Sequence, residues 1–128
     1  MKKDNKGFSL VELIIVIAIM AVLVGVLAPQ FIKYVEQSRR SRDIQTAQEI
    51  REAVLADIAD GSLTGNGSVA QANMTSLSTI SETPVPSAKG LGTLTFSASY
   101  NAKDGVCYVL CGTYTLTTES GASQYKAA

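Results

Sequence analysis

The sequence predicts an α+β fold in which a long, bent N-terminal helix, about residues 8–59, packs its C-terminal half on a small antiparallel sheet of three to four strands. Three observations predict it. Hydrophobic residues fill 22 of the 28 positions from Phe8 to Val35. Apolar residues then recur at helical spacing over 44–58, and the region after Gly92 alternates apolar and polar residues as half-buried strands do.

The first element is long enough to span a membrane. From Leu13 to Ala28 no side chain is polar, and the flanking residues extend the run to about 25 mostly apolar positions, which at about 1.5 Å per residue crosses a hydrocarbon core of roughly 30 Å. The basic residues ahead of it predict a cytoplasmic N-terminus: Lys2, Lys3 and Lys6.

Three other kinds of N-terminal segment fit less well. A secretory signal peptide needs a small-x-small cleavage site, but a large residue stands first in Val26-Leu27-Ala28. A lipoprotein needs a cysteine at the end of the apolar run, where none occurs. A plain signal anchor leaves Glu12 unexplained, because a carboxylate inside a membrane costs about 2.5–3.5 kcal/mol.

The motif that accounts for these residues is Lys6-Gly7-Phe8-Ser9-Leu10-Val11-Glu12-Leu13, followed by the apolar run and Pro29. It resembles the N-terminus of type IV prepilins. The resemblance implies that residues 1–7 are a leader peptide, which a membrane-embedded prepilin peptidase removes by cutting between Gly7 and Phe8 on the cytoplasmic side. It also implies N-methylation of Phe8 and residence in a filament built of copies of this chain.

Glu12 is the only acidic residue between Phe8 and Val35. Cleavage would create a cationic amino group on Phe8 at the head of an apolar helix, and this cation needs a countercharge once subunits stack. The resemblance implies that Glu12 pairs with the amino terminus of a neighbouring subunit. Because breaking one partner of a buried pair costs about 3–5 kcal/mol, such a pair can fix the register between subunits.

Gly25 and Pro29 mark a weak turn in the apolar helix of residues 8–35. Pro29 has no N–H, so the carbonyl of Gly25 loses its helical partner. We expect a bend here and, as in related pilins, loosening or extension of the segment when subunits pack into a filament. A fixed kink that does not change on assembly is the alternative.

Residues 36–128 are predicted to form a small globular head that starts with an amphipathic helix over 36–59. One face is apolar: Ile44, Ala47, Ile50, Val54, Leu55 and Ile58. The opposite face carries Asp43, Gln45, Glu49, Glu52 and Asp57. The charged run Glu36–Asp43 is interpreted as a solvated helix face, and Gly61 as the stop after the helix.

The remainder of the head divides into a connection, a sheet and a tail. Residues 60–90 are rich in Gly, Ser, Thr and Asn and predict a long αβ-loop with a short helix around 71–80. Residues 91–118 predict the sheet, with Leu94, Phe96, Ala98 and Tyr100 facing one way, a hairpin loop over 101–105, a strand over 106–111 and a third strand with Tyr114 and Leu116. Residues 119–128 form the C-terminal tail.

The two cysteines, Cys107 and Cys111, leave three states open. In one continuous strand they face the same way with Cα atoms about 13 Å apart, beyond the reach of a disulfide. Pilins often carry a C-terminal disulfide, with longer loops than the three residues enclosed here. Buried thiols, a bridge across a break near Gly112 and pairing between subunits therefore all stay open.

The composition argues against several function classes. The 128 residues contain no His, which removes the usual general base, and two cysteines with scattered carboxylates do not make a metal site. We expect no enzymatic activity, metal or cofactor. Eleven basic residues balance eleven acidic ones without a basic patch, so no nucleic-acid partner is indicated.

The resemblance implies a structural subunit of a type IV pilus. The precursor would cross the inner membrane once, meet the prepilin peptidase and N-methyltransferase, and be polymerised by an inner-membrane assembly machinery into an extracellular fimbrium. Adhesion, twitching motility or DNA uptake would then be properties of the fibre.

Two alternatives stay open at this stage. One is a major pseudopilin of a type II secretion system, although few acidic residues stand near the C-terminal end where that family tends to bind calcium. The other is a membrane-anchored extracellular binding module, in which the spacing of Gly7, Phe8 and Glu12 would be a coincidence.

Overall fold

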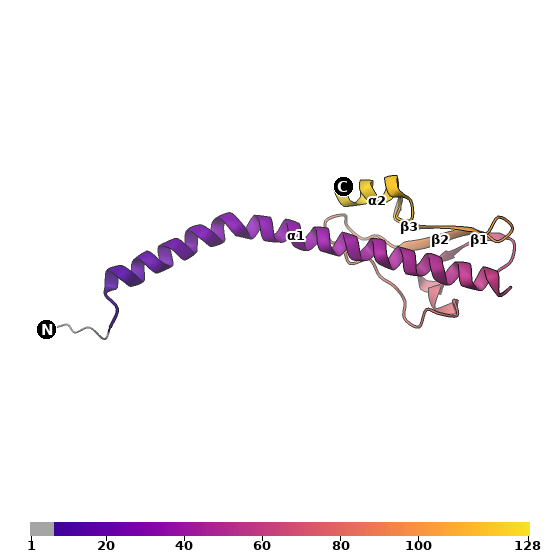
Figure 1. Ribbon diagram of the computed structural model, residues 1–128, viewed down its shortest axis with the longest axis horizontal. Helices are drawn as coiled ribbons and strands as arrows, with labels where there is room; N and C mark the ends of the chain where they lie inside the picture. Colours follow the sequence, from indigo (N-terminus) through magenta and orange to yellow (C-terminus); the bar gives the residue numbers. More distant parts are fainter. Residues whose placement is uncertain (1–6) are drawn as a thin grey trace. The chain divides into compact units, whose positions relative to one another are not determined.

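The computed structural model describes residues 7–128, and the leader residues 1–6 lie outside the described part. The chain divides into two compact units, Met1–Val35 and Glu36–Ala128, and helix α1 (Leu10–Ala59) continues from the first into the second. Figure 1 shows this helix, the sheet of the second unit and the short C-terminal helix. The expected α+β fold, with a long N-terminal helix and a small antiparallel sheet, is confirmed.

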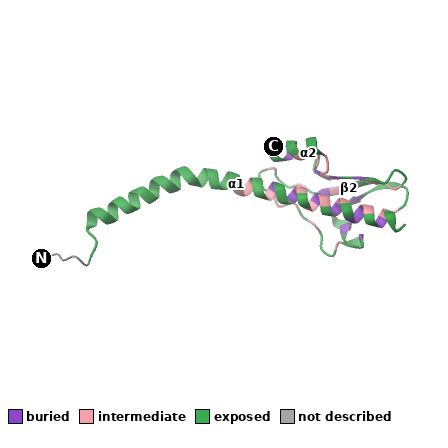
Figure 2. Ribbon diagram, in the orientation of Figure 1, coloured by how far each residue is buried: buried purple, intermediate pink, exposed green. Residues whose placement is uncertain are grey.

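In the first unit, α1 exposes its side chains on all sides. Every described residue from Gly7 to Tyr34 is exposed, and most of the side chains involved are large and apolar. Figure 2 colours this part of the helix as exposed throughout. By length and composition it is the one helix among residues 7–128 that could cross a membrane. Gly25 and Pro29 both lie inside the assigned helix, so their expected bend or loosening stays a prediction.

In the second unit, a four-stranded antiparallel sheet has the order β1-β2-β3-β4. Its strands are β1 (Asn66–Ala70), β2 (Phe96–Asn101), β3 (Val106–Cys111) and β4 (Tyr114–Thr115). The β2–β3 hairpin has the predicted loop, with Tyr100 opposite Cys107 and Ala98 opposite Val109. The predicted short helix is the 3₁₀ helix η1 (Gln71–Ser76).

The core of this unit forms between the C-terminal half of α1 and the sheet. The predicted apolar stripe is confirmed: Ala47, Ile50 and Val54 are buried, and Ile44, Leu55 and Ile58 pack against the same cluster. Phe96 and Ala98 supply the buried face of β2, as the alternation predicted. Figure 2 shows buried and exposed residues alternating along this half of α1.

Two elements lie where the sequence predicted none. Strand β1 lies in the segment that was expected to be the αβ-loop. The sequence does not predict this strand because Asn, Gly and Ser have weak strand preference and only Val69 of the strand is buried. Helix α2 (Glu119–Ala127) replaces the expected tail. The side chain of Thr118 caps it by accepting from the N–H of Gly121 over 3.2 Å, and Tyr125 anchors it in the core.

Candidate processing and assembly site

The Gly7–Phe8 bond lies ahead of α1, in the part of the chain that is not helical. Gly7 is in a bend, Phe8 and Ser9 have no regular structure, and the side chain of Phe8 is 87% exposed. A Cβ atom added to Gly7 would meet no other atom within 4 Å. Packing within the described chain therefore does not require a small residue at this position.

Ser9 begins the helix, a role that the sequence analysis missed. Its hydroxyl oxygen accepts a hydrogen bond from the backbone N–H of Glu12 over 3.1 Å, and its carbonyl accepts from the N–H of Leu13. This is an N-cap, which satisfies a helix N–H that has no partner inside the helix. The spacing Ser9-x-x-Glu12 is that of a capping box, and this signal could have identified Ser9 from the sequence.

Glu12 stands in the first turn of α1 among apolar side chains. A hollow of about 490 Å³ is lined by Phe8, Glu12, Leu13, Ile15 and Val16, so that Glu12 provides the charge in an otherwise apolar surface. Its position at the N-terminus of the helix suits a carboxylate, because the helix dipole is positive there. Phe8 and Glu12 thus share one surface of the first unit, and their roles in cleavage and subunit pairing stay predictions.

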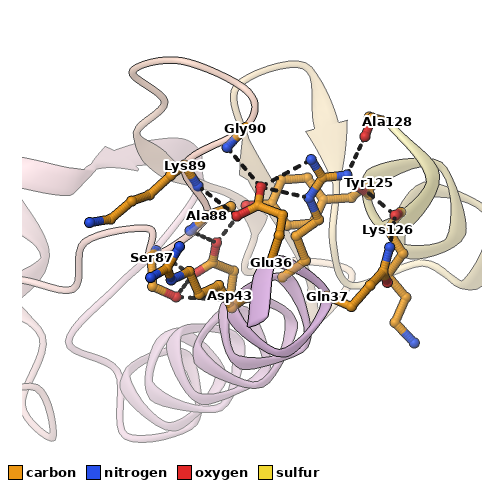
Figure 3. Close-up of polar contacts among 12 residues, drawn as sticks. Glu36, Gln37, Asp43, Ser87, Ala88, Lys89, Gly90, Tyr125, Lys126 and Ala128 are labelled. Atoms are coloured by element: carbon orange, nitrogen blue, oxygen red, sulfur yellow. Dashed lines mark hydrogen bonds and ion pairs between the residues drawn. The ribbon is translucent and has the colours of Figure 1, made fainter. Parts of the chain in front are cut away.

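The charged run Glu36–Asp43 is solvated only in part: Arg42 is exposed, whereas the interpretation as a solvated face was wrong for Glu36, Arg40 and Asp43. Glu36 is half-buried, while Arg40 and Asp43 are 5% and 1% exposed. Figure 3 shows the side chains of Glu36 and Asp43 directed toward Ser87, Ala88, Lys89 and Gly90 of the αβ-loop. The placement of Asp43 and Asp57 on the polar face of the helix was also wrong, because both are buried.

Three carboxylates of α1 bind backbone N–H groups of the αβ-loop. Asp43 accepts from Ser87 N at 2.6 Å and Ala88 N at 3.0 Å. Glu36, one heptad earlier, accepts from Lys89 N at 3.1 Å and Gly90 N at 2.7 Å. Asp57, two heptads after Asp43, accepts from Ser78 N at 3.1 Å. Residues seven apart lie on nearly the same face of a helix, so these three hold residues 78–90 along one line.

Burial raises the pKa of Glu36, but the hydrogen bonds from Lys89 and Gly90 and the adjacent Arg40 outweigh it and lower the pKa below its usual value. Arg40 lies 3.0 Å from Glu36 through its Nη2. Its Nη1 donates to the carbonyl oxygens of Tyr125 and Lys126 at 3.2 and 3.3 Å and also contacts that of Ala128. Arg40 therefore caps the C-terminal end of α2, where carbonyls have no partner inside the helix.

Cys107 and Cys111 are buried, free thiols on the same side of strand β3. Burial raises the pKa of Cys107 to about 11, against a smaller lowering by Arg51. Burial also raises the pKa of Cys111, whose sulfur donates to the hydroxyl of Tyr125 over 3.7 Å. Because β3 is unbroken between them, the geometry favours the buried-thiol state, and their state in the assembled protein stays a prediction.

Among the described residues no group of three or more His, Cys, Asp and Glu side chains could hold a metal ion. The described residues offer an exposed Gly7–Phe8 bond outside the helix and one carboxylate, Glu12, near it. In the head, the αβ-loop and the C-terminal helix are both bonded to α1.

Comparison with known proteins points to the same N-terminal segment. The model of the prokaryotic N-terminal methylation motif matches residues 2–28. A type IV major fimbrial protein FimA of Dichelobacter nodosus is 37% identical over 65 residues, which cover 51% of this chain and 42% of that protein. The FimA of strain VCS1703A is 30% identical over 98 residues, which cover 71% of this chain and 60% of that protein.

A probable minor fimbrial protein of the same species is 42% identical over 66 residues, which cover 51% of this chain and 42% of that protein. The matched regions thus span about two fifths to three fifths of these relatives' own lengths. No solved structure matches the chain.

Proposed function

We propose that this chain, a type IV pilin by its N-terminal methylation motif and its fimbrial relatives, is a structural subunit that polymerises into an extracellular pilus. One observation carries the proposal. The described residues of the first unit form a helix with apolar side chains exposed on all sides, and the single acidic group among them, Glu12, lies beside an accessible Gly7–Phe8 bond. Such a surface is unstable in water and must be covered by lipid or by other copies.

The same helix would serve in both environments. Before assembly it spans the inner membrane with its N-terminus in the cytoplasm, where prepilin peptidase cuts after Gly7 and the new amino group of Phe8 is methylated. After assembly it forms the core of the fibre, in which Glu12 pairs with the amino group of a neighbouring Phe8. The head of residues 36–128 then coats this core.

The relatives favour this function over the alternatives. The three relatives described above are fimbrial proteins. A structural role also fits the described residues better than catalysis does. Adhesion, twitching motility and DNA uptake are roles of an assembled fibre, and we propose them for the pilus and not for the isolated subunit.

The experiment that tests the proposal combines processing with assembly. We expect the mature protein to begin at N-methylated Phe8, as measured by mass spectrometry, and sheared surface material to contain long fibres that an antibody against this chain labels in the electron microscope. A variant with a bulky side chain, Gly7→Trp, should accumulate as uncut precursor, whereas Gly25→Ala should be processed. A mature protein that begins at Met1 would reject the pilin function, and short periplasmic fibres would favour the pseudopilus.

A further inference from the structure

A groove of about 610 Å³ lies on the head between the C-terminal half of α1 and residues 79–84. Apolar side chains line much of it: Ile50, Ala53, Ala56, Ile80 and Pro84. Three exposed carboxylates border it, from Glu49, Glu52 and Glu82. Within residues 7–128 the one salt bridge joins Glu36 to Arg40, so the groove contains three carboxylates without a cationic partner.

The complementary charge lies on the same helix. Arg42 is exposed and forms no salt bridge in the described part of the chain. It precedes Glu49 by seven residues, which places the two side chains within about 20° around the helix and about 10.5 Å apart along it. The head therefore presents a basic position and an acidic, partly apolar groove at different heights on one face.

We propose that in the pilus the guanidinium of Arg42 of one copy docks in the groove of the next copy, between Glu49, Glu52 and Glu82. This inference rests on the proposed function and defines a contact between heads. An arginine suits the groove because its methylene stem packs on apolar side chains while its planar head binds carboxylates. The occupant is a second copy because the charges are complementary and because the register at Glu12 brings them together.

The register follows from helix geometry. If Glu12 of one copy pairs with the amino group of Phe8 of its neighbour, the two copies are displaced by four residues, or about 6 Å along the helix. Copies in a helical fibre are related by one screw operation, so the heads are displaced along the fibre by the same amount.

Where residues 36–59 of each copy run along the fibre, Glu49 of the first copy lies level with residue 45 of the neighbour. It is about 4.5 Å in height from the neighbour's Arg42, which two long side chains bridge. In the reverse pairing, Arg42 of the first copy would be about 16.5 Å in height from Glu49 of the neighbour. The contact is therefore directional, as an interface that builds an open fibre must be.

Reversal of charge tests this contact in the full chain. We expect Arg42→Glu and Glu49→Arg each to lower the yield of sheared filaments at least about fivefold, because attraction between heads becomes repulsion. The amount of processed subunit in the membrane should stay unchanged. The double variant, Arg42→Glu with Glu49→Arg, should recover most of the yield. Lys103→Glu, the same change at an exposed position of the β2–β3 loop, should assemble like the parent.

A second measurement does not depend on yield. In filaments of the variant Arg42→Cys with Glu49→Cys, a short bis-maleimide should link copies into a ladder of oligomers, whereas Lys103→Cys with Glu49→Cys should give none. Single reversals that assemble like the parent, or a double variant without recovery and without the ladder, would overturn the contact while leaving the pilus intact. A parent chain that forms no filament would instead overturn the proposed function, and the contact with it.

Discussion

The hydroxyl of Tyr125 donates a hydrogen bond of 2.5 Å to the carboxylate of Asp43, across 82 residues of sequence. Both side chains are almost completely buried, and Asp43 receives two backbone N–H bonds from the αβ-loop as well. One carboxylate on α1 thus joins the loop, the helix and the C-terminal helix α2. Each donor compensates part of the cost of burying the charge.

We expect Tyr125→Phe to lower the free energy of unfolding of the head by about 1–3 kcal/mol, because Asp43 is left with one donor fewer in a buried site. Urea unfolding of the full chain in detergent, followed by near-ultraviolet circular dichroism, measures the change. Tyr108→Phe is the matched control. Tyr108 is 49% exposed on β3, so removal of its hydroxyl should leave the free energy of unfolding almost unchanged. Equal stability of the two variants would contradict the role of the Tyr125 hydroxyl.

The ion pair at the start of the head predicts a dependence of stability on pH. The hydrogen bonds from Lys89 and Gly90 and the neighbouring Arg40 outweigh burial and lower the pKa of Glu36 below its ordinary value of 4.5. A carboxyl whose pKa is lower in the folded state stabilises that state above pH 4.5 and loses this contribution as the pH falls through the lowered pKa.

We therefore expect Glu36→Gln to be less stable than the parent at neutral pH and to approach it as the pH falls below about 4.5. Thermal unfolding of both proteins between pH 3 and pH 7 gives the comparison. Glu49→Gln makes the same chemical change at an exposed position outside the hydrogen bonds of Glu36. The difference in unfolding temperature between this variant and the parent should stay nearly constant over the same pH range. A gap between parent and Glu36→Gln that widens in acid would have the wrong sign for this explanation.

Close packing of α2 on the end of the sheet predicts a severe effect at Gly121. A Cβ atom there would lie 2.0 Å from the carbonyl oxygen of Thr115, which is backbone and cannot turn aside. We expect Gly121→Ala to destabilise the head by about 3 kcal/mol or more, at the upper end for overpacked sites. Ser120→Ala, on the exposed side of the same helix, should be near neutral, and an equally mild Gly121→Ala would show that α2 lies farther from β4.

The burial of Cys107 and Cys111 predicts slow alkylation of their thiols. Burial raises the pKa of Cys107 to about 11, so little thiolate exists at pH 8, and the thiolate is the form that reacts. We expect iodoacetamide to leave both cysteines unmodified in the native protein and to modify both after unfolding in urea without reductant. An exposed cysteine in the same sheet, Ser99→Cys, should react at once. A native mass that is lower by two hydrogens and rises on reduction would instead demonstrate a disulfide.

The sequence predicts the elements in which apolar residues recur at regular spacing. It does not predict those whose stability depends on a single tertiary contact. The stripe over 44–58 and the alternation in β2 are periodic, and both are confirmed. Helix α2 has one apolar anchor, Tyr125, and a glycine, so its stability depends on packing that no local pattern shows. A carboxylate on a helix is ordinarily predicted to be exposed to solvent. Glu36, Asp43 and Asp57 instead face the αβ-loop, because this distant segment brings backbone N–H groups that bind them.

The candidate site around residues 7–12 shows the same division between features that the sequence predicts and features that it does not. The motif of Gly7, Phe8 and Glu12 could be recognised from spacing alone, and the family model covers it. The cap of Ser9 could also have been predicted, because a serine three residues before a glutamate has the spacing of a capping box. The groove bordered by Glu49 and Glu82 could not be predicted, since it forms only when residues 79–84 lie against α1.

The carboxylate of Glu12 and its backbone N–H have separate roles at the start of α1. The cap at the start of α1 uses the backbone N–H of Glu12 and not its carboxylate. Glu12→Ala therefore keeps the cap, and we expect this variant to be inserted and processed normally but to give few or no filaments. Ser9→Ala removes the cap at a cost of about 1 kcal/mol to the helix and keeps the charge, so filaments should still form. Immunoblots of membrane and sheared fractions measure both steps. Normal fibres from Glu12→Ala would reject the pairing with Phe8, whereas loss of fibres in both variants would assign the effect to the helix start.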